Sequence, residues 1–346
     1  MSAGASRERR APGRHLVLVG CTASGKSALA MDLARRRRSV GREVEIISCD
    51  SMAVYRSMDV GTATPSAAEQ AEVRHHLVDV VDPDEEFSVQ RFATAVADTL
   101  DGIESRGADA VLVGGTGLYV RSVTDGLDLP ARYPEVAARL DAEPDTAALA
   151  RRLEELDPLA ASRIPPGNRR RLVRALEVTI GSGRPFSANG PGLGVYAPTP
   201  FVLVGLRLPR DVVAARIRAR YDQQLADGFL DEVRALADRD GGVSRTAAEA
   251  LGYRELLAHL RGECPLDDAV ATAVARTRRF AVRQERWFRR DPRIRWFGLP
   301  PDPVVAGDPT SSVTADVDAF WSERAAAGRG SATTVDGDGR ASDRTV

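Results

Sequence analysis

The chain has 346 residues, with 48 basic and 49 acidic side chains and a formal net charge of −1 at pH 7. This length is sufficient for two domains, or for one large domain that carries an insertion. Its three cysteines show neither C-x-x-C nor metal-ligand spacing, so we expect free thiols in a reducing cytoplasm and no zinc site. No apolar run approaches the length of a membrane span, which excludes a membrane-spanning protein.

Both ends of the chain have the composition of disordered segments. Residues 1–14 contain arginines without a following apolar stretch of signal-peptide length, so we predict a disordered leader. Residues 325–346 contain almost no large apolar side chains, and we predict a disordered tail there.

The segment from His15 to Arg36 has the pattern of a strand, a glycine turn and a helix. Its turn, GCTASGKS, fits G-x-x-x-x-G-K-[ST] at every constrained position. In such a loop the backbone N–H groups and the helix N-terminus bind phosphate, the lysine adds an ammonium group, and the hydroxyl can bind Mg²⁺. The predicted phosphate-binding residues are Gly20, Cys21, Thr22, Ala23, Ser24, Gly25, Lys26 and Ser27.

Lys26 is the only lysine of the chain, since all other basic residues of the 48 are arginines. A composition that otherwise uses arginine keeps the compact ammonium group where a planar guanidinium would not fit a phosphate loop, which indicates a functional residue. The lack of a second lysine also excludes the N-K-x-D guanine-recognition motif of regulatory GTPases.

Two more turns are predicted at the same edge of a parallel sheet. The buried strand pattern VEIIS ends just before Asp50, and the apolar run from Val111 to Val113 leads into a GGTG turn that contains Thr116. Ligands of open α/β sheets bind beyond the carboxyl ends of the strands. Asp50 could therefore act as a general base or metal ligand, or could only cap the next turn. Three converging turns predict an active site.

The segment between these two turns contains a predicted strand and a predicted helix. HHLVDVVDP, from His75 to Pro83, has a strand pattern whose adjacent histidines favour structural or substrate contacts over metal binding. Ser88 is predicted to cap a helix from about Val89 to Arg106.

Residues 125–198 show helical patterns with proline breaks and no strand pattern. We predict a helical insertion into an α/β core formed by residues 15–124 and 199–324. The insertion contains RIPPGNRRRLVRALEV, in which five arginines precede the first acidic residue, Glu177. Such a surface favours phosphate contacts over a merely solvated helix face.

The sheet is predicted to resume at residues 201–208, before a long helix from Asp211 to about Asp238 that places Arg216 and Arg220 on one face. Between Arg276 and Arg295 nine arginines alternate with aromatic side chains. This pattern is typical of a surface that contacts a nucleic-acid backbone.

Seven blocks in order resemble the bacterial tRNA dimethylallyltransferases, also called tRNA isopentenyltransferases. They are GCTASGKS, DSMAVYRSMDVGTATP, HHLVDVVDP, GGTGLYV, DPLAASRIPPGNRRRLVRALEV, LGYREL and RRFAVRQERWFRRDPRI, over about residues 15–298. The resemblance implies transfer of a dimethylallyl group from dimethylallyl diphosphate to N6 of adenosine 37, in the anticodon stem-loop of tRNA. It also implies a P-loop NTPase-like parallel sheet flanked by helices, with Mg²⁺ as cofactor, and we favour a monomer.

The resemblance further implies roles for individual residues. Asp50 is the expected general base at the adenine N6, Thr116 helps to position that base, and Lys26 and Ser27 serve the diphosphate and Mg²⁺. Arg216 and Arg220 match arginines that reach either the diphosphate or the RNA, and the resemblance leaves this choice open. The expected tRNA-contacting residues are Asp50, Ser51, Met52, Ala53, Thr116, Arg170, Arg171, Leu172, Val173, Arg174, Glu249, Ala250, Leu251, Gly252, Tyr253 and Arg254.

The chain departs from the family pattern at four positions. Cys21 replaces the usual proline, Ala53 replaces a common glutamine, and Pro165 and Gly167 depart from I-H-P-N. None of these removes a group that the chemistry needs.

Three alternatives remain on the sequence alone. The first is an adenylate isopentenyltransferase that uses free AMP or ADP, which the extended arginine-rich surface disfavours. The second is a P-loop small-molecule kinase, and the third is a non-catalytic RNA-binding protein that retains a phosphate loop.

Overall fold

The computed structural model describes residues 10–127, 129–190, 192–299 and 309–332. The chain divides into two compact units. We call Met1–Thr124 with Pro198–Val346 the core unit, and Asp125–Ala197 the insertion unit.

The core unit is built on a six-stranded sheet in which every pair of neighbours is parallel, in the order β3-β2-β4-β1-β5-β6. The strands are β1 (Leu16–Val19), β2 (Val44–Ser48), β3 (His75–His76), β4 (Asp109–Gly114), β5 (Val202–Arg207) and β6 (Arg295–Gly298). The central strands are almost continuous apolar runs because helices cover both faces of the sheet. The predicted fold class, a parallel α/β sheet flanked by helices, is confirmed.

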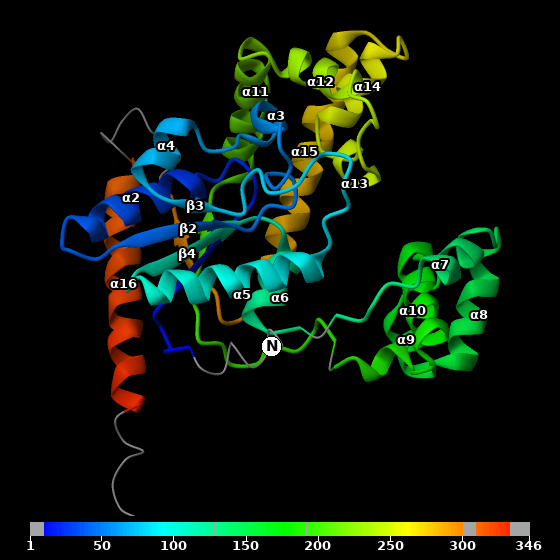
Figure 1. Ribbon diagram of the computed structural model, residues 1–346, viewed down its shortest axis with the longest axis horizontal. Coiled ribbons are helices and arrows are strands. Elements are labelled where there is room, and N and C mark those ends of the chain that lie inside the picture. Colours follow the sequence, from blue (N-terminus) through cyan, green and yellow to red (C-terminus); the bar gives the residue numbers. More distant parts are fainter. Residues whose placement is uncertain (1–9, 128, 191, 300–308, 333–346) are drawn as a thin grey trace, which may run out of the picture. The chain divides into compact units, whose positions relative to one another are not determined.

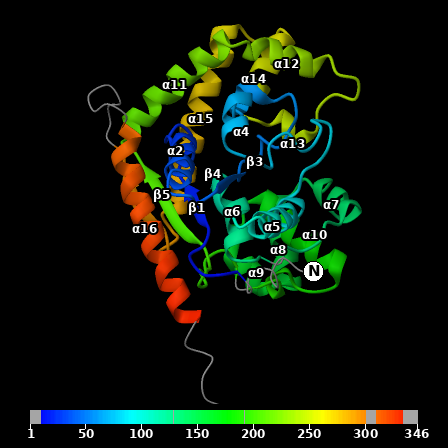
Figure 2. The same cartoon turned by 60° about the vertical axis from the view of Figure 1, so that its left-hand side comes forward.

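Helices α2 and α16 cover one face of the sheet, and α5 and α6 cover the other (Figure 2). The first helices of the core unit are α2 (Lys26–Arg38), α3 (Asp59–Thr62), α4 (Ala67–Glu72), α5 (Val89–Ser105) and α6 (Gly117–Thr124). Those after the insertion are α11 (Arg210–Ala226), α12 (Phe229–Ala237), α13 (Arg245–Ala248), α14 (Tyr253–Leu260), α15 (Leu266–Phe288) and α16 (Pro309–Ala332). Helix α5 begins after Ser88 as predicted, and the Ser88 hydroxyl accepts the N–H of Arg91.

The insertion unit consists of helices around a small apolar core of its own (Figure 1). Its elements are α7 (Pro134–Asp141), α8 (Thr146–Leu156), α9 (Pro158–Arg163), α10 (Arg169–Ser182) and the short 3₁₀ helix η1 (Phe186–Ala188). Leu149, Leu153, Leu172 and Leu176 are buried in this core. The described residues of the unit contain no strand.

Two predicted elements of the core unit differ from the structure. The single helix expected over residues 211–238 is divided into α11 and α12, because Gly228 adopts φ +95°, a left-handed conformation that ends a helix. The strand expected over residues 75–83 is only two residues long, since Leu77 has φ +59° and turns the chain away from the sheet.

The predictions for the two ends were wrong over the described residues. Arg10 is buried and donates hydrogen bonds to Asp101 and Glu104, and the N–H of Gly13 donates to the carbonyl oxygen of Pro200, so this segment is held within the core unit. Trp321 of α16 donates its indole N–H to the carbonyl oxygens of this segment. Helix α16 continues to Ala332. Alanine favours a helix, and Ala325 is buried one helical turn after the buried Trp321, on the same face of the helix. Residues 1–9 and 333–346 lie outside the described part.

Among the described residues, no helix combines the length and apolar content needed to cross a bilayer.

Candidate active site

The sheet order brings the three predicted turns together. Strand β4 lies between β1 and β2, and the register pairs Val19 with Gly114 and Val113 with Ser48. The three strands therefore end at the same level, and the phosphate loop, Asp50 and Thr116 follow directly from those ends. This edge of the sheet is the candidate active site.

The phosphate loop is wound tightly around the start of α2. Gly25, with φ +87°, precedes the helix, and Ala23 also has a left-handed φ of +61°. Nζ of Lys26 donates to the carbonyl oxygen of Cys21 at 3.0 Å, which folds the side chain back over the loop. Burial lowers the pKa of Lys26, and the negative charge of Asp50 partly offsets this. Ser27 is exposed in the first helical turn.

Asp50 is fixed by the chain that follows it. Its Oδ1 accepts the N–H of Met52 at 2.8 Å, which holds the carboxylate in a turn of its own backbone. The hydroxyl of Thr116 accepts the N–H of Ser51 at 3.2 Å. Thr116 therefore contacts the residue next to Asp50, although the two belong to different turns.

Two arginines of α11 lie at the phosphate loop. Nη1 of Arg220 is 3.4 Å from the hydroxyl of Thr22, and its Nη2 donates to the carbonyl oxygen of Thr62 at 3.0 Å. Nη1 of Arg216 would be 3.7 Å from a Cβ added to Gly25. Both guanidinium groups thus lie near the loop that precedes Lys26, which concentrates positive charge where an anion would bind.

Gln284 of α15 belongs to the site but was not predicted from the sequence. Its side chain is almost completely buried and hydrogen bonds with both Thr22 and Gly115. The available signal was a lone amide in the otherwise small or apolar buried stripe that includes Ala281 and Phe288.

Glu232 of α12 was also missed. Its carboxylate accepts the first backbone N–H groups of α3, those of Asp59, Val60 and Gly61, at 2.7 to 3.1 Å. It also accepts the hydroxyl of Tyr253 at 2.6 Å. An acidic group at a helix N-terminus is a common cap, but a partner more than 170 residues away leaves no local signal.

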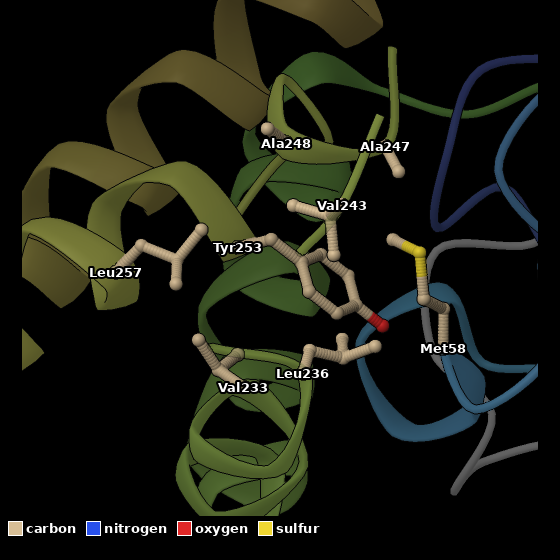
Figure 3. Close-up of a pocket in the computed structure, with 8 residues that line it drawn as sticks. All are labelled: Met58, Val233, Leu236, Val243, Ala247, Ala248, Tyr253 and Leu257. Atoms are coloured by element: carbon tan, nitrogen blue, oxygen red, sulfur yellow. The ribbon is translucent and has the colours of Figure 1, made fainter. Parts of the chain in front are cut away.

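Figure 3 shows the pocket beside Tyr253, whose ring lies among aliphatic side chains. The pocket is lined by Met58, Val233, Leu236, Val243, Ala247, Ala248, Tyr253 and Leu257, none of which is charged. It is therefore a packing gap behind the Glu232 cap and has no group that would bind phosphate.

The expected tRNA-contacting segment of α10 offers fewer side chains than predicted. Leu172 and Val173 are buried in the core of the insertion unit, which corrects their expected surface role. Arg174 is an ion-pair partner of the buried Glu177. Only Arg170 and Arg171 of the predicted set are exposed, and no hydrogen bond or ion pair of their side chains is described.

The other expected tRNA-contacting segments are also partly buried. Ala53, Ala250, Gly252 and Tyr253 lie in the interior, and the last two pack against Phe229 of α12. In the later segment Glu249 and Arg254 are exposed and form an ion pair at 3.2 Å.

Comparison with known proteins identifies relatives over most of the chain. A family model described as IPP transferase matches residues 53–291. A tRNA dimethylallyltransferase of Kineococcus radiotolerans is 46% identical over 289 residues, which are 82% of this chain and 90% of the relative. The corresponding enzyme of Streptomyces coelicolor is 44% identical over 286 residues, 82% of this chain and 89% of the relative.

A solved structure resembles most of the chain. The crystal structure of a full-length tRNA isopentenylpyrophosphate transferase from Bacillus halodurans has a TM-score of 0.67 and 34% sequence identity. The match covers 92% of this chain and 99% of that one.

Proposed function

Because this chain belongs to the IPP transferase family, we propose that it transfers a dimethylallyl group from dimethylallyl diphosphate to N6 of adenosine 37 in tRNA. The observation that carries this proposal is the phosphate loop with Lys26, Arg216 and Arg220 around it, at the edge of the sheet where Asp50 also lies. The reaction forms a bond between N6 and C1 of the dimethylallyl group. It breaks the bond between C1 and the diphosphate oxygen, and N6 loses a proton.

The phosphate loop provides the stabilisation that the departing diphosphate needs. Its backbone N–H groups, Lys26, Arg216 and Arg220 would bind the negative charge that grows on the leaving group. The negative charge on the leaving group is greater in the transition state than in the bound donor. These contacts would therefore lower the activation barrier of transfer, in addition to stabilising the bound donor.

Magnesium fits this site as a partner of the diphosphate. Among the described residues no cluster of three or more His, Cys, Asp or Glu side chains could hold a metal ion. Mg²⁺ often takes few protein ligands and completes its shell with phosphate oxygens and water, so the exposed Ser27 hydroxyl is the ligand that we propose. The ion would add positive charge at the leaving group.

Asp50 is the proposed base. Its carboxylate is fixed by the N–H of Met52, and Thr116 holds the adjoining backbone at Ser51. An adenine that enters the site would therefore meet a positioned acceptor for its N6 proton. An adenine stacked in the anticodon loop has to leave the stack to reach this position.

Exposed arginines of each unit provide contacts for the tRNA backbone. Arg170 and Arg171 lie on α10 of the insertion unit. In the core unit α15 exposes Arg278, Arg279, Arg283 and Arg286, and the exposed Arg289 and Arg290 follow this helix directly. Contacts with phosphates along a stem would supply the free energy that extrudes the base. We further propose that the protein acts as a monomer in the cytoplasm, since one chain supplies all these groups and its cysteines are free.

The test is a set of incubations with labelled dimethylallyl diphosphate and, separately, unmodified tRNA, AMP or ADP, followed by nucleoside analysis. We expect N6-dimethylallyladenosine only from tRNA, and only at adenosine 37, with none formed by Lys26→Ala. Modified AMP or ADP would instead identify an adenylate isopentenyltransferase. Hydrolysis of ATP without prenyl transfer would identify a phosphoryl-transfer enzyme.

A further inference from the structure

The phosphate loop and the GGTG turn are joined by one side chain from a distant part of the sequence. Oε1 of Gln284 accepts the backbone N–H of Thr22 at 2.8 Å, and Nε2 of the same amide donates to the carbonyl oxygen of Gly115 at 2.9 Å. Gln284 is 7% exposed, so water does not compete for these bonds. A side-chain amide accepts at its oxygen and donates at its nitrogen, so one uncharged group makes both bonds.

The GGTG turn is shaped to admit this amide. A Cβ added to Gly115 would lie 2.2 Å from Nε2 of Gln284 and 3.3 Å from the carbonyl oxygen of Gly20, so a side chain at this position would displace Gln284. The next helical turn of α15 makes a similar approach, since a Cβ on Gly117 would lie 2.2 Å from Nε1 of Trp287. The glycines of this turn thus permit α15 to approach the site closely.

The two ends of the amide contact parts of the site with different tasks. Thr22 belongs to the loop that holds the donor's diphosphate, and its hydroxyl also meets Arg220. Gly115 directly precedes Thr116, which holds the backbone next to Asp50. Gln284 therefore links the donor side to the acceptor side beyond the ends of β1 and β4, where the pairing of these two strands stops.

We propose that Gln284 is a positioning residue that fixes the phosphate loop and the Thr116 turn at the distance that prenyl transfer requires. The proposal rests on the proposed function, because it assigns the donor to the loop and the adenine to the Thr116 side. Bond formation requires the reacting atoms to meet at about 3 to 3.5 Å, and a misplacement of about 1 Å can cost about 10²-fold in rate. Gln284 therefore contributes to the rate of transfer and not to the affinity for either substrate.

Substitutions at Gln284 should separate rate from affinity. We expect Gln284→Ala to lower the single-turnover rate at saturating substrates by about 10²-fold. The dissociation constants for inorganic diphosphate and for tRNA should stay within about threefold, because the phosphate and RNA ligands remain. Gln284→Glu can accept from Thr22 but cannot donate to Gly115 when ionised, so it should be nearly as slow.

A substitution on the same helix provides the matched control. Thr277 of α15 is buried and shares a 2.9 Å hydrogen bond with the hydroxyl of Tyr221, but it contacts neither turn. Thr277→Val removes a buried hydrogen bond and should leave the transfer rate within about twofold. If Gln284→Ala transfers as fast as Thr277→Val, or if its whole defect is weaker diphosphate binding, Gln284 does not position the site.

Gly115 tests the same contact from the other side. Gly115→Ala should displace the Gln284 amide and slow transfer, and the double variant with Gln284→Ala should be no slower than Gln284→Ala alone. If the rate loss of the double variant equals the product of the two single losses, the proposal is overturned, because Gly115 and Gln284 then act separately.

Hydrogen exchange measures the contact without any activity. The amide of Thr22 should exchange faster in Gln284→Ala than in the unaltered protein or in Thr277→Val, because its acceptor is lost. Unchanged exchange would contradict the proposal. If the unaltered protein transfers no prenyl group to tRNA, the proposed function fails, whereas the exchange result still decides whether Gln284 holds the loop.

Discussion

Substitutions in α10 should separate arginines that contact RNA from arginines that maintain the fold. Arg170 and Arg171 are exposed and have no described ion-pair partner, so they are available to phosphates. Each phosphate contact contributes about 0.9 to the slope of log K against log salt concentration for a duplex. Replacing both with alanine should therefore reduce the slope of tRNA binding by up to about 2, with unchanged diphosphate binding.

Arg174→Ala should act on the helix itself. Its Nη2 donates to the carbonyl oxygen of Pro130 at 2.6 Å, and its Nη1 lies 2.8 Å from Oε1 of Glu177, although not aligned for a hydrogen bond. The side chain of Glu177 is 2% exposed, and that of Arg174 is 26% exposed. Breaking a fully buried pair costs about 3 to 5 kcal/mol. Because Arg174 is partly solvated and Glu177 keeps the N–H of Tyr133, we expect about 2 kcal/mol.

Two measurements distinguish the variants. Salt titrations of tRNA binding report the phosphate contacts, and hydrogen exchange of the α10 amides reports the stability of the insertion unit. We expect the double variant to change only the salt slope, and Arg174→Ala to accelerate exchange of α10 by about 30-fold, the equivalent of 2 kcal/mol. If the double variant binds tRNA with unchanged affinity and slope, the insertion unit does not hold the RNA through these arginines.

Three further substitutions test the roles of the core unit. Lys26→Ala should abolish prenyl transfer while tRNA binding in a gel-shift assay stays largely intact, and equal loss of both would place the phosphate loop in the RNA site. Asp50→Asn should slow the single-turnover reaction by about 10²-fold or more without a matching loss of diphosphate affinity; a rate near that of the unaltered protein would exclude Asp50 as the base. Arg216→Ala should weaken inorganic diphosphate binding by about tenfold or more in calorimetry, the scale of one charged hydrogen bond. Arg218→Ala, which removes an exposed pair with Asp222 on the same helix, should bind as the unaltered protein does, and equal affinities of the two variants would remove Arg216 from the diphosphate site.

The central sheet and the edge that carries the site could be predicted because their signals are local. A strand, the glycine turn and a helix follow one another between His15 and Arg36. The apolar runs before Asp50 and Thr116 likewise show where two further strands end. Since strands of a parallel sheet end at the same edge, three local patterns were sufficient to place three groups together.

Contacts between distant segments could not be predicted in the same way. Gln284 and Thr22 are separated by 262 positions, and their bond uses a backbone N–H that no residue type reveals. Likewise Arg169 and Arg174 look like members of a basic helix face, but both donate to backbone carbonyl oxygens, Arg169 at the end of α7 and Arg174 at Pro130. The break at Gly228 did have a local signal, an Asp-Gly pair, which the apolar pattern across it obscured.

Helix α16 supports the phosphate loop from the opposite end of α2. Arg37 of α2 is 1% exposed, its guanidinium lies 3.4 Å from the centre of the Trp321 ring, and its Nε donates to Asp318 at 2.7 Å. The neighbouring Arg36 also pairs with Asp318. The helix that begins at Lys26 is thus anchored by residues beyond the stretch that the family model matches.

This anchor decides where the protein can be shortened. A chain ended at Gly298 would keep every block that resembles the family, yet it would leave the Arg37 guanidinium without Asp318 and expose the apolar surface under Trp321. The minimal catalytic protein is therefore longer than its catalytic motifs. Likewise, a fusion partner is better attached beyond Ala332 than within α16, because this helix holds Arg36 and Arg37 of α2 through Asp318 and Trp321.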